Sequence, residues 1–152
     1  MVTHEHVRNI FAGPSKGDMA SFWPHVEPNV DWTVKGTAPE CHNCCSILAH
    51  HITGTHCKVS GRYRSIEEFQ QGTRALSSTW AGPLHLVVQN IIIEGNQAAV
   101  ELKAVNTETK SGDPFPNEYT WVLGFNDSGK IATVRAYMDT DLVTRVIEKN
   151  PQ

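Results

Sequence analysis

Residues 117–141 read NEYTWVLGFNDSGKIATVRAYMDTD, and this stretch decides the fold. Its middle, Asn126-Asp127-Ser128-Gly129, consists of turn-forming residues, and the glycine at its end accepts a positive φ. Side chains before and after the turn alternate between two faces, as they do in the strands of a half-buried sheet. The sequence therefore predicts a β-hairpin that leads into a helix. Its apolar face carries Tyr119, Trp121, Leu123, Val134, Ala136 and Met138.

Helical patterns lie mainly before the hairpin. Thr3, Asp18 and Ser65 are each placed to cap one helix, and Asp139 or Thr140 begins a last one. Helices kept apart from an antiparallel meander predict an α+β fold rather than a doubly wound parallel sheet. In chain order we expect a helix at 3–12, a short helix from 18, a strand at 30–35, a helix at 65–79, strands at 84–93 and 98–108, the hairpin, and a closing helix from 140.

Size and charge exclude several classes of protein. The chain has 152 residues, which predicts a single domain, and a net charge of −3, without the basic excess of nucleic-acid-binding proteins. Its longest apolar run, Ile91-Ile92-Ile93, is far too short to span a bilayer. The first residues include His and Glu where a signal peptide would be apolar. We therefore expect a cytoplasmic protein that binds neither nucleic acid nor membrane.

One segment concentrates all the cysteines. The spacing Cys41-x2-Cys44 resembles that of zinc ligands, but the remaining spacings fit no standard metal site, so no metal is predicted. The alternatives are a loop near a pocket mouth or an insertion at about 40–60, which a translated intron could also produce. The segment contains Cys41, His42, Cys44, Cys45, His50, His51, His56 and Cys57.

The element order, together with GDMASFWPHVEPNVDWTVKGT (17–37) and NDSGKIATVRAYMD (126–139), resembles the nuclear transport factor 2-like superfamily. Within it, the SnoaL-like relatives of ketosteroid isomerase are the most similar group. The resemblance covers nearly the whole chain except about 40–60, and Gly61-Arg62-Tyr63-Arg64-Ser65 carries part of it. It implies a cone-shaped curved sheet wrapped around helices, a deep apolar pocket and a homodimer. The superfamily includes isomerases, cyclases, dehydratases, epoxide hydrolases and proteins without catalysis.

The family's acidic residues are missing from this chain. Ile10 stands where ketosteroid isomerases have a tyrosine, and Trp121 where they have a protonated aspartic acid. Their aspartate base falls near Trp32, next to Asp31 rather than on it. Ala136 replaces an acid of limonene epoxide hydrolase. The resemblance therefore predicts the fold without supplying the mechanism.

Several residues could still support chemistry in such a pocket. Tyr119, with Asn117 beside it, could donate a hydrogen bond to a carbonyl, and Asp31 or His85 could act as a base. Strand alternation argues against Asp31 as the base, because Asp31 points outward if Trp32 points inward. Glu101 would be a further base if its strand turned it inward, although a solvated face is the simpler interpretation. The expected ligand-binding residues are Trp32, Asn117, Trp121, Val134, Ala136 and Met138.

The leading functional prediction is a small-molecule enzyme. It would isomerise, cyclise or dehydrate an apolar, ring-bearing carbonyl compound by proton transfer. One base and one hydrogen-bond donor suffice for such chemistry, so no organic cofactor is expected. The alternative is a non-catalytic protein that binds a hydrophobic ligand or a protein partner.

Overall fold

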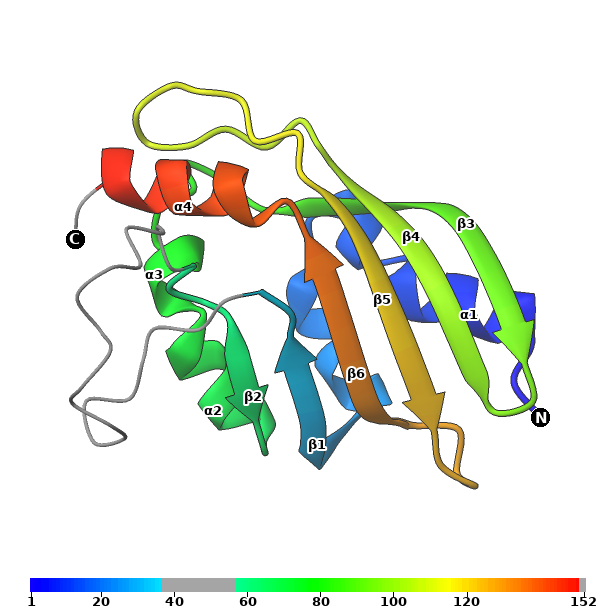
Figure 1. Ribbon diagram of the computed structural model, residues 1–152. Helices are drawn as coiled ribbons and strands as arrows, with labels where there is room; N and C mark the ends of the chain where they lie inside the picture. The colour runs from blue at the N-terminus through cyan, green and yellow to red at the C-terminus, as the bar shows by residue number, and fades with distance from the viewer. Residues whose placement is uncertain (37–56, 151–152) are drawn as a thin grey trace, which may run out of the picture.

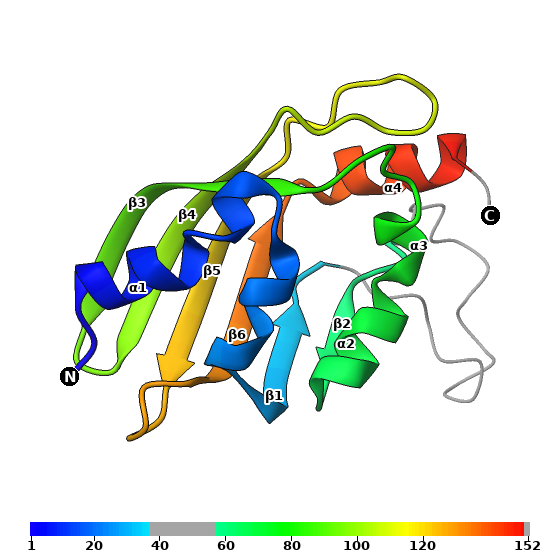
Figure 2. The ribbon, with the colours of Figure 1, turned by 180° about the vertical axis from the view of Figure 1, so that it is seen from behind.

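The computed structural model describes residues 1–36 and 57–150, which form a curved sheet with the helical segments of residues 4–25 and 66–77 over one face and the last helix beyond one end (Figures 1 and 2). In chain order the elements are α1 (His4–Phe11), η1 (Pro14–Lys16), η2 (Met19–Ser21), η3 (Trp23–His25), β1 (Val26–Val34), β2 (Gly61–Tyr63), α2 (Ile66–Gly72), α3 (Arg74–Ser77), β3 (His85–Glu94), β4 (Gln97–Val105), β5 (Glu118–Phe125), β6 (Ile131–Met138) and α4 (Thr140–Lys149), where η denotes a 3-10 helix.

The six strands form one sheet in the order β2-β1-β6-β5-β4-β3. The predicted meander from β3 to β6 is antiparallel throughout. In contrast, β1 pairs in parallel with β6, and Trp32 lies opposite Val134. The first strand of the chain is thus joined to the last, and only β2 lies beyond it. The predicted α+β class is confirmed, with a mixed, mostly antiparallel sheet.

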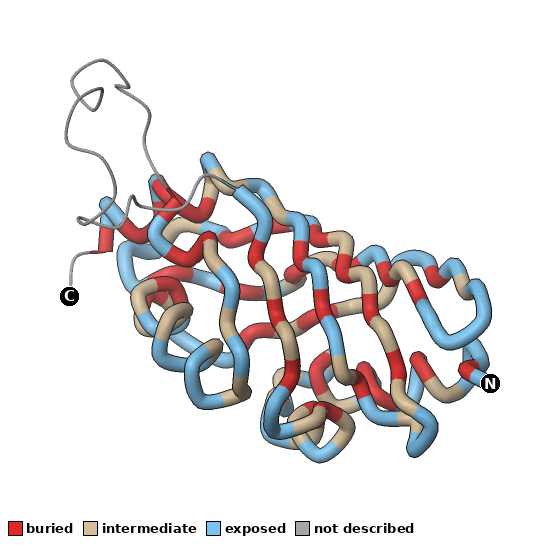
Figure 3. The backbone as a smooth tube through the Cα atoms, turned by 60° about the horizontal axis from the view of Figure 1, so that its bottom comes forward, coloured by how far each residue is buried: buried red, intermediate tan, exposed pale blue. Residues whose placement is uncertain are grey.

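The hairpin that dominates the sequence forms as predicted. Asn126 Oδ1 accepts hydrogen bonds from the backbone N–H groups of Ser128 and Lys130, and Gly129 has a φ of 77°. Tyr119, Trp121 and Leu123 are buried on β5, whereas the residues between them are half-buried. Figure 3 shows the same alternation of buried and more exposed positions along the neighbouring strands. The period of two in the sequence therefore identified the inner face of the sheet.

The helix α1 is capped by Thr3, whose hydroxyl oxygen accepts a hydrogen bond from the His6 N–H at 3.1 Å. Its apolar stripe of Val7, Ile10 and Phe11 is buried against the sheet. The second predicted helix is wrong: residues 14–25 form three short 3-10 turns. Gly17, with a φ of 84°, ends the first turn, and prolines occupy the first turns of η1 and η3. The chain therefore winds over the sheet without a continuous helix.

The predicted helix at 65–79 is present but interrupted. Ser65 caps α2 by accepting from the Glu68 N–H at 3.0 Å. At Thr73 the backbone leaves helical geometry, with a φ of −98° and a ψ of 3°, and α3 begins at the next residue. The Thr73 hydroxyl donates to the Phe69 carbonyl at 2.8 Å. This break sets the shape of the site described below.

The predicted insertion at about 40–60 lies largely outside the described residues, as do seven of the eight cysteines and histidines named above. Of that segment, residues 57–60 are described, and Cys57 and Val59 are buried in the core. Within residues 1–36 and 57–150, no helix is long and apolar enough to cross a membrane. The outer face of the sheet, where a homodimer is predicted, exposes Tyr137 to 46%. The homodimer stays a prediction.

Candidate functional site

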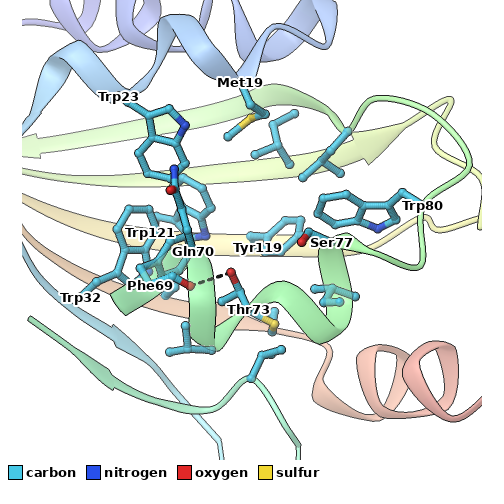
Figure 4. Close-up of a pocket in the computed structure, with 17 residues that line it drawn as sticks. Met19, Trp23, Trp32, Phe69, Gln70, Thr73, Ser77, Trp80, Tyr119 and Trp121 are labelled. Carbon is cyan, nitrogen blue, oxygen red and sulfur yellow. Dashed lines mark hydrogen bonds between the residues drawn. The ribbon is translucent and has the colours of Figure 1, made fainter. Parts of the chain in front are cut away.

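A cavity of about 240 Å³ lies between the inner face of the sheet and the segments α2 and α3 (Figure 4). The strands β1, β5 and β6 supply one wall, the two helical segments supply the opposite wall, and the 3-10 turns supply Met19 and Trp23. Its lining consists of Met19, Trp23, Trp32, Val34, Val59, Phe69, Gln70, Thr73, Leu76, Ser77, Trp80, Leu84, Leu86, Tyr119, Trp121, Ala136 and Met138.

One end of the cavity is built from stacked aromatic rings. The rings of Trp32 and Phe69 lie 4.0 Å apart at an angle of 26°, and Trp121 meets Trp32 edge to face at 5.2 Å. Trp23 closes the same end, 6.1 Å from Phe69. Aromatic pairs at these separations hold one another in place and provide flat apolar walls. This end of the cavity is therefore shaped for a flat apolar group.

Tyr119 supplies the ionisable group of the lining among the described residues. Burial raises the pKa of its phenol well above the ordinary value, and the nearby Asn117 side chain opposes this rise to a smaller extent. Asn117 itself is fully buried, and its Oδ1 accepts a hydrogen bond from the Asp139 N–H at 3.2 Å. Its Nδ2 makes no hydrogen bond of good geometry with any described residue. Tyr119 is therefore a neutral hydrogen-bond donor near neutral pH.

The opposite wall carries hydroxyl groups from the interrupted helix. Thr73 donates to the Phe69 carbonyl at 2.8 Å, and Ser77 donates to the Arg74 carbonyl at 3.3 Å. Gln70 lies one turn before Thr73 on the same side. These groups and Tyr119 are polar but uncharged, so the described lining offers hydrogen bonds without charge.

Comparisons of sequence and of structure give different results. No family model and no curated protein matches the sequence. Among solved structures, an NTF2-like protein from Burkholderia thailandensis matches with a TM-score of 0.66 and 21% identity, over 97% of this chain and 98% of that one. The chain has the nuclear transport factor 2-like fold. The resemblance that the sequence motifs indicated is thereby confirmed for the fold.

Two further proteins whose solved structures match this chain were crystallised with small molecules. TerC, co-crystallised with polyporic acid, matches with a TM-score of 0.61 and 18% identity over 95% of this chain and 96% of its own. A protein with a ketosteroid isomerase-like fold from Catenulispora acidiphila, in complex with trimethylamine, matches with a TM-score of 0.59 and 10% identity, over 90% of this chain and 86% of that one. At such identities the likeness establishes the fold and leaves the activity open.

Within this nuclear transport factor 2-like fold, the structure places five of the expected residues along the cavity. They come from three neighbouring strands whose registers bring them side by side. Two others do not line it: Val134 is buried in the core two residues before Ala136 on β6, and Asn117 lies buried beside Tyr119. The five are Trp32, Tyr119, Trp121, Ala136 and Met138.

His85 does not line the cavity. Leu84 and Leu86 do, and because successive residues of a strand face opposite ways, the residue between them is turned elsewhere. A Cβ built on Gly17 would lie 3.0 Å from His85 Nε2, so the ring lies beside the turn after η1. The structure therefore gives no support to His85 as a base in this cavity.

Asp31 lies on the opposite face of β1 from Trp32. Its carboxylate accepts two hydrogen bonds from Arg62, at 2.8 Å and 2.6 Å, on the exposed side of the sheet. This hydrogen-bonded guanidinium lowers the pKa of Asp31, which is the reverse of what a pocket base requires. Glu101 is also exposed on the outer face. The interpretation of Asp31 as a pocket base is corrected by this placement.

The helical wall was not among the predicted site residues. The residues Phe69, Thr73, Leu76 and Trp80 were visible as one face of the predicted helix, but such a stripe normally indicates contact with a core. The stripe does face the sheet, yet it stands far enough away to leave a cavity. Two polar residues at helical spacing on this face, Thr73 and Ser77, were the signal available in the sequence.

Proposed function

We propose that this chain binds an uncharged, flat, ring-bearing small molecule, and that Tyr119 donates a hydrogen bond to a carbonyl of that molecule. The observation that carries the proposal is the lining: among the described residues it combines six aromatic side chains with no carboxylate, imidazole, ammonium or guanidinium group. Ligand sites of this kind are mainly apolar with a few placed polar groups, and this cavity of about 240 Å³ lies just below the usual range of ~300–1,000 Å³, which favours a small ligand.

The aromatic end favours a neutral ring over a cation. Quaternary ammonium groups bind to the open faces of aromatic rings. Here Phe69 covers one face of Trp32 at 4.0 Å, and no anion in the described lining would balance a buried positive charge. Two neighbours with the same fold were crystallised with small molecules, polyporic acid in one and trimethylamine in the other. These neighbours support small-molecule binding, and the geometry here favours the neutral class.

Binding, rather than catalysis, is the function that this geometry supports best. An isomerase, cyclase or dehydratase needs a base as well as a donor. Tyr119 supplies the donor, whereas His85 and Asp31 lie outside the cavity. A proton-transfer enzyme would therefore require a base other than these two residues.

A matched pair of compounds tests the proposal. The ketone 1-tetralone and the hydrocarbon tetralin share a two-ring skeleton and differ in one carbonyl. Titration monitored by tryptophan fluorescence should show binding of both, with the ketone about 3- to 10-fold tighter, as one net hydrogen bond predicts. Tyr119→Phe should abolish that preference. The control Tyr137→Phe, which changes an exposed tyrosine on the outer face, should leave it unchanged.

Two outcomes would refute this proposal. One is the absence of binding for both compounds under conditions in which the protein is folded by circular dichroism. The other is tighter binding of tetramethylammonium than of 1-tetralone, since it would assign the aromatic end to a cation.

A further inference from the structure

We infer that the ligand carries a hydroxyl group on the edge opposite its carbonyl, and that Thr73, assisted by Ser77, accepts the hydrogen bond of that hydroxyl. The inference rests on the proposed function and narrows its ligand to a hydroxylated cyclic ketone. It assigns a specificity-determining role to the interrupted helix, which contributes no charged group to the described lining.

The helical wall can only accept hydrogen bonds at its hydroxyl groups. A hydroxyl has one proton to donate and two lone pairs. The Thr73 proton is committed to the Phe69 carbonyl at 2.8 Å, a short and favourable distance. Ser77 is exposed, and its proton is directed at the Arg74 carbonyl at the longer distance of 3.3 Å. Thr73 therefore presents lone pairs to the cavity from a fixed, part-buried hydroxyl, whereas the lone pairs of Ser77 are also open to solvent.

The sheet wall has the opposite character. Tyr119 keeps its proton, because burial raises its pKa, and the indole N–H of Trp121 can only donate. Trp121 Nε1 has no hydrogen-bond partner among the described residues. This wall therefore offers donors.

The two walls face each other across one cavity. Figure 4 shows Thr73 and Ser77 on the helical segments and Tyr119 on the sheet, and all three line the cavity. A molecule that matches both walls has an acceptor on one edge and a donor on the other. A molecule without the donor leaves the Thr73 lone pairs unmatched in an apolar surrounding, and buried polar groups without partners make such sites selective. Gln70 carries both a donor and an acceptor and so does not fix the polarity.

A set of four two-ring compounds separates the contributions of the walls. The probes are 6-hydroxy-1-tetralone, 1-tetralone, 5,6,7,8-tetrahydro-2-naphthol and tetralin, titrated against the wild type and the variants Thr73→Val, Ser77→Ala and Thr73→Val/Ser77→Ala. The wild type should bind 6-hydroxy-1-tetralone about 3- to 10-fold more tightly than 1-tetralone. Thr73→Val should remove most of this hydroxyl preference, and the double variant all of it. The control Tyr137→Phe, which changes an exposed tyrosine outside the cavity, should leave all four affinities unchanged.

Each result has a defined meaning. Equal binding of the hydroxylated and unhydroxylated ketones by the wild type overturns the inference and leaves the proposed function intact. A hydroxyl preference that survives in the folded double variant also overturns it. Failure of all four probes refutes the proposed function itself. Thr73→Val removes the hydrogen bond to Phe69 as well, so Ser77→Ala provides an independent reading if the threonine variant does not fold.

Discussion

The two ends of the inner sheet face carry the same kind of side chain but are covered differently. At one end, α1 inserts Val7, Ile10 and Phe11, each no more than 1% exposed, and leaves a solid core. At the other, the interrupted pair α2 and α3 faces Trp121 across the cavity. The strand β5 runs through both ends, with Leu123 in the solid part and Trp121 in the hollow part. The cavity therefore depends on how α2 and α3 cover this face, and the sheet alone does not determine it.

A matched pair of phenylalanines should show the largest difference between the ends. Phe11 is 1% exposed and contacts the rings of Phe22 and Trp121, so Phe11→Ala should lower the free energy of unfolding by about 3–5 kcal/mol. Phe69→Ala should cost about 1–2 kcal/mol, because one side of that ring already faces the cavity. Urea denaturation of both variants measures the difference. Equal losses would mean that the two ends are packed alike.

A substitution at Gly72 tests how tightly α2 packs beside the cavity. A Cβ at this position would overlap the Tyr63 ring, which is fixed by a hydrogen bond from its hydroxyl to the Val59 carbonyl at 2.7 Å. Gly72→Ala should therefore destabilise the protein by about 1–3 kcal/mol, although alanine normally favours a helix. At Gly82 no atom lies within 4 Å of the place that an alanine methyl group would occupy, so Gly82→Ala is the control and should be neutral or slightly stabilising. Thermal denaturation that ranks the two variants the other way would contradict this picture of α2.

A larger side chain in the cavity should weaken ligand binding with little change in the stability of the fold. Ala136 lines the cavity, whereas Val134, two residues earlier on the same face of β6, is enclosed by core. Ala136→Leu should reduce the affinity for 1-tetralone at least about 10-fold while changing stability by less than about 1 kcal/mol. Val134→Leu should overpack the core and cost about 1–3 kcal/mol. Calorimetric titration combined with urea denaturation tests both, and an equally destabilised Ala136→Leu would show that the space is not free.

The smallest effect is expected on the outer face, at the pair of Asp31 and Arg62. The hydrogen bond from Arg62 lowers the pKa of Asp31 in the folded protein, so the pair stabilises the fold above the unfolded carboxyl pKa of about 3.9. That contribution is lost as the pH falls through the lower folded-state pKa. Asp31→Asn should lower the melting temperature at pH 7 by at most about 2 °C, because the pair is exposed. The difference from the wild type should vanish in acid, and Arg62→Gln should behave alike; a constant difference at all pH values would exclude an ionic origin.

The fold was largely predictable because local chemistry specifies it. The caps Thr3, Ser65 and Asp139 mark the starts of α1, α2 and α4, and the Asn126–Gly129 turn fixes the hairpin. The parallel pairing of β1 with β6 was not predicted from these patterns, since no local signal records which distant strand is a neighbour. The 3-10 turns were missed because the apolar spacing around Trp23 imitates a helix that the glycine and prolines prevent.

The site was predictable only in part. Alternation grouped Trp121 and Ala136 on the apolar face of the hairpin, and both line the cavity; the same rule could have excluded His85 through Leu84 and Leu86. Alternation could not show that Ala136 lines the cavity and Val134 does not, because both lie on the same face of β6. The edge of the cavity depends on the distance between the covering helix and the sheet. Periodicity reports which face is covered, and it does not report whether the covering side chains fill the space.

The parallel pair of β1 and β6 has a consequence for the order of synthesis. Val34 and its partner Ala136 both line the cavity, yet about a hundred residues of chain separate them. During synthesis the N-terminal part of the chain leaves the ribosome first. Trp32 and its neighbours on β1 therefore cannot form this wall until β6 has been synthesised. Pairings between such distant segments close slowly. The hollow end should be the last part of the sheet to assemble, and a chain interrupted before β6 would lack the wall on which ligand binding depends.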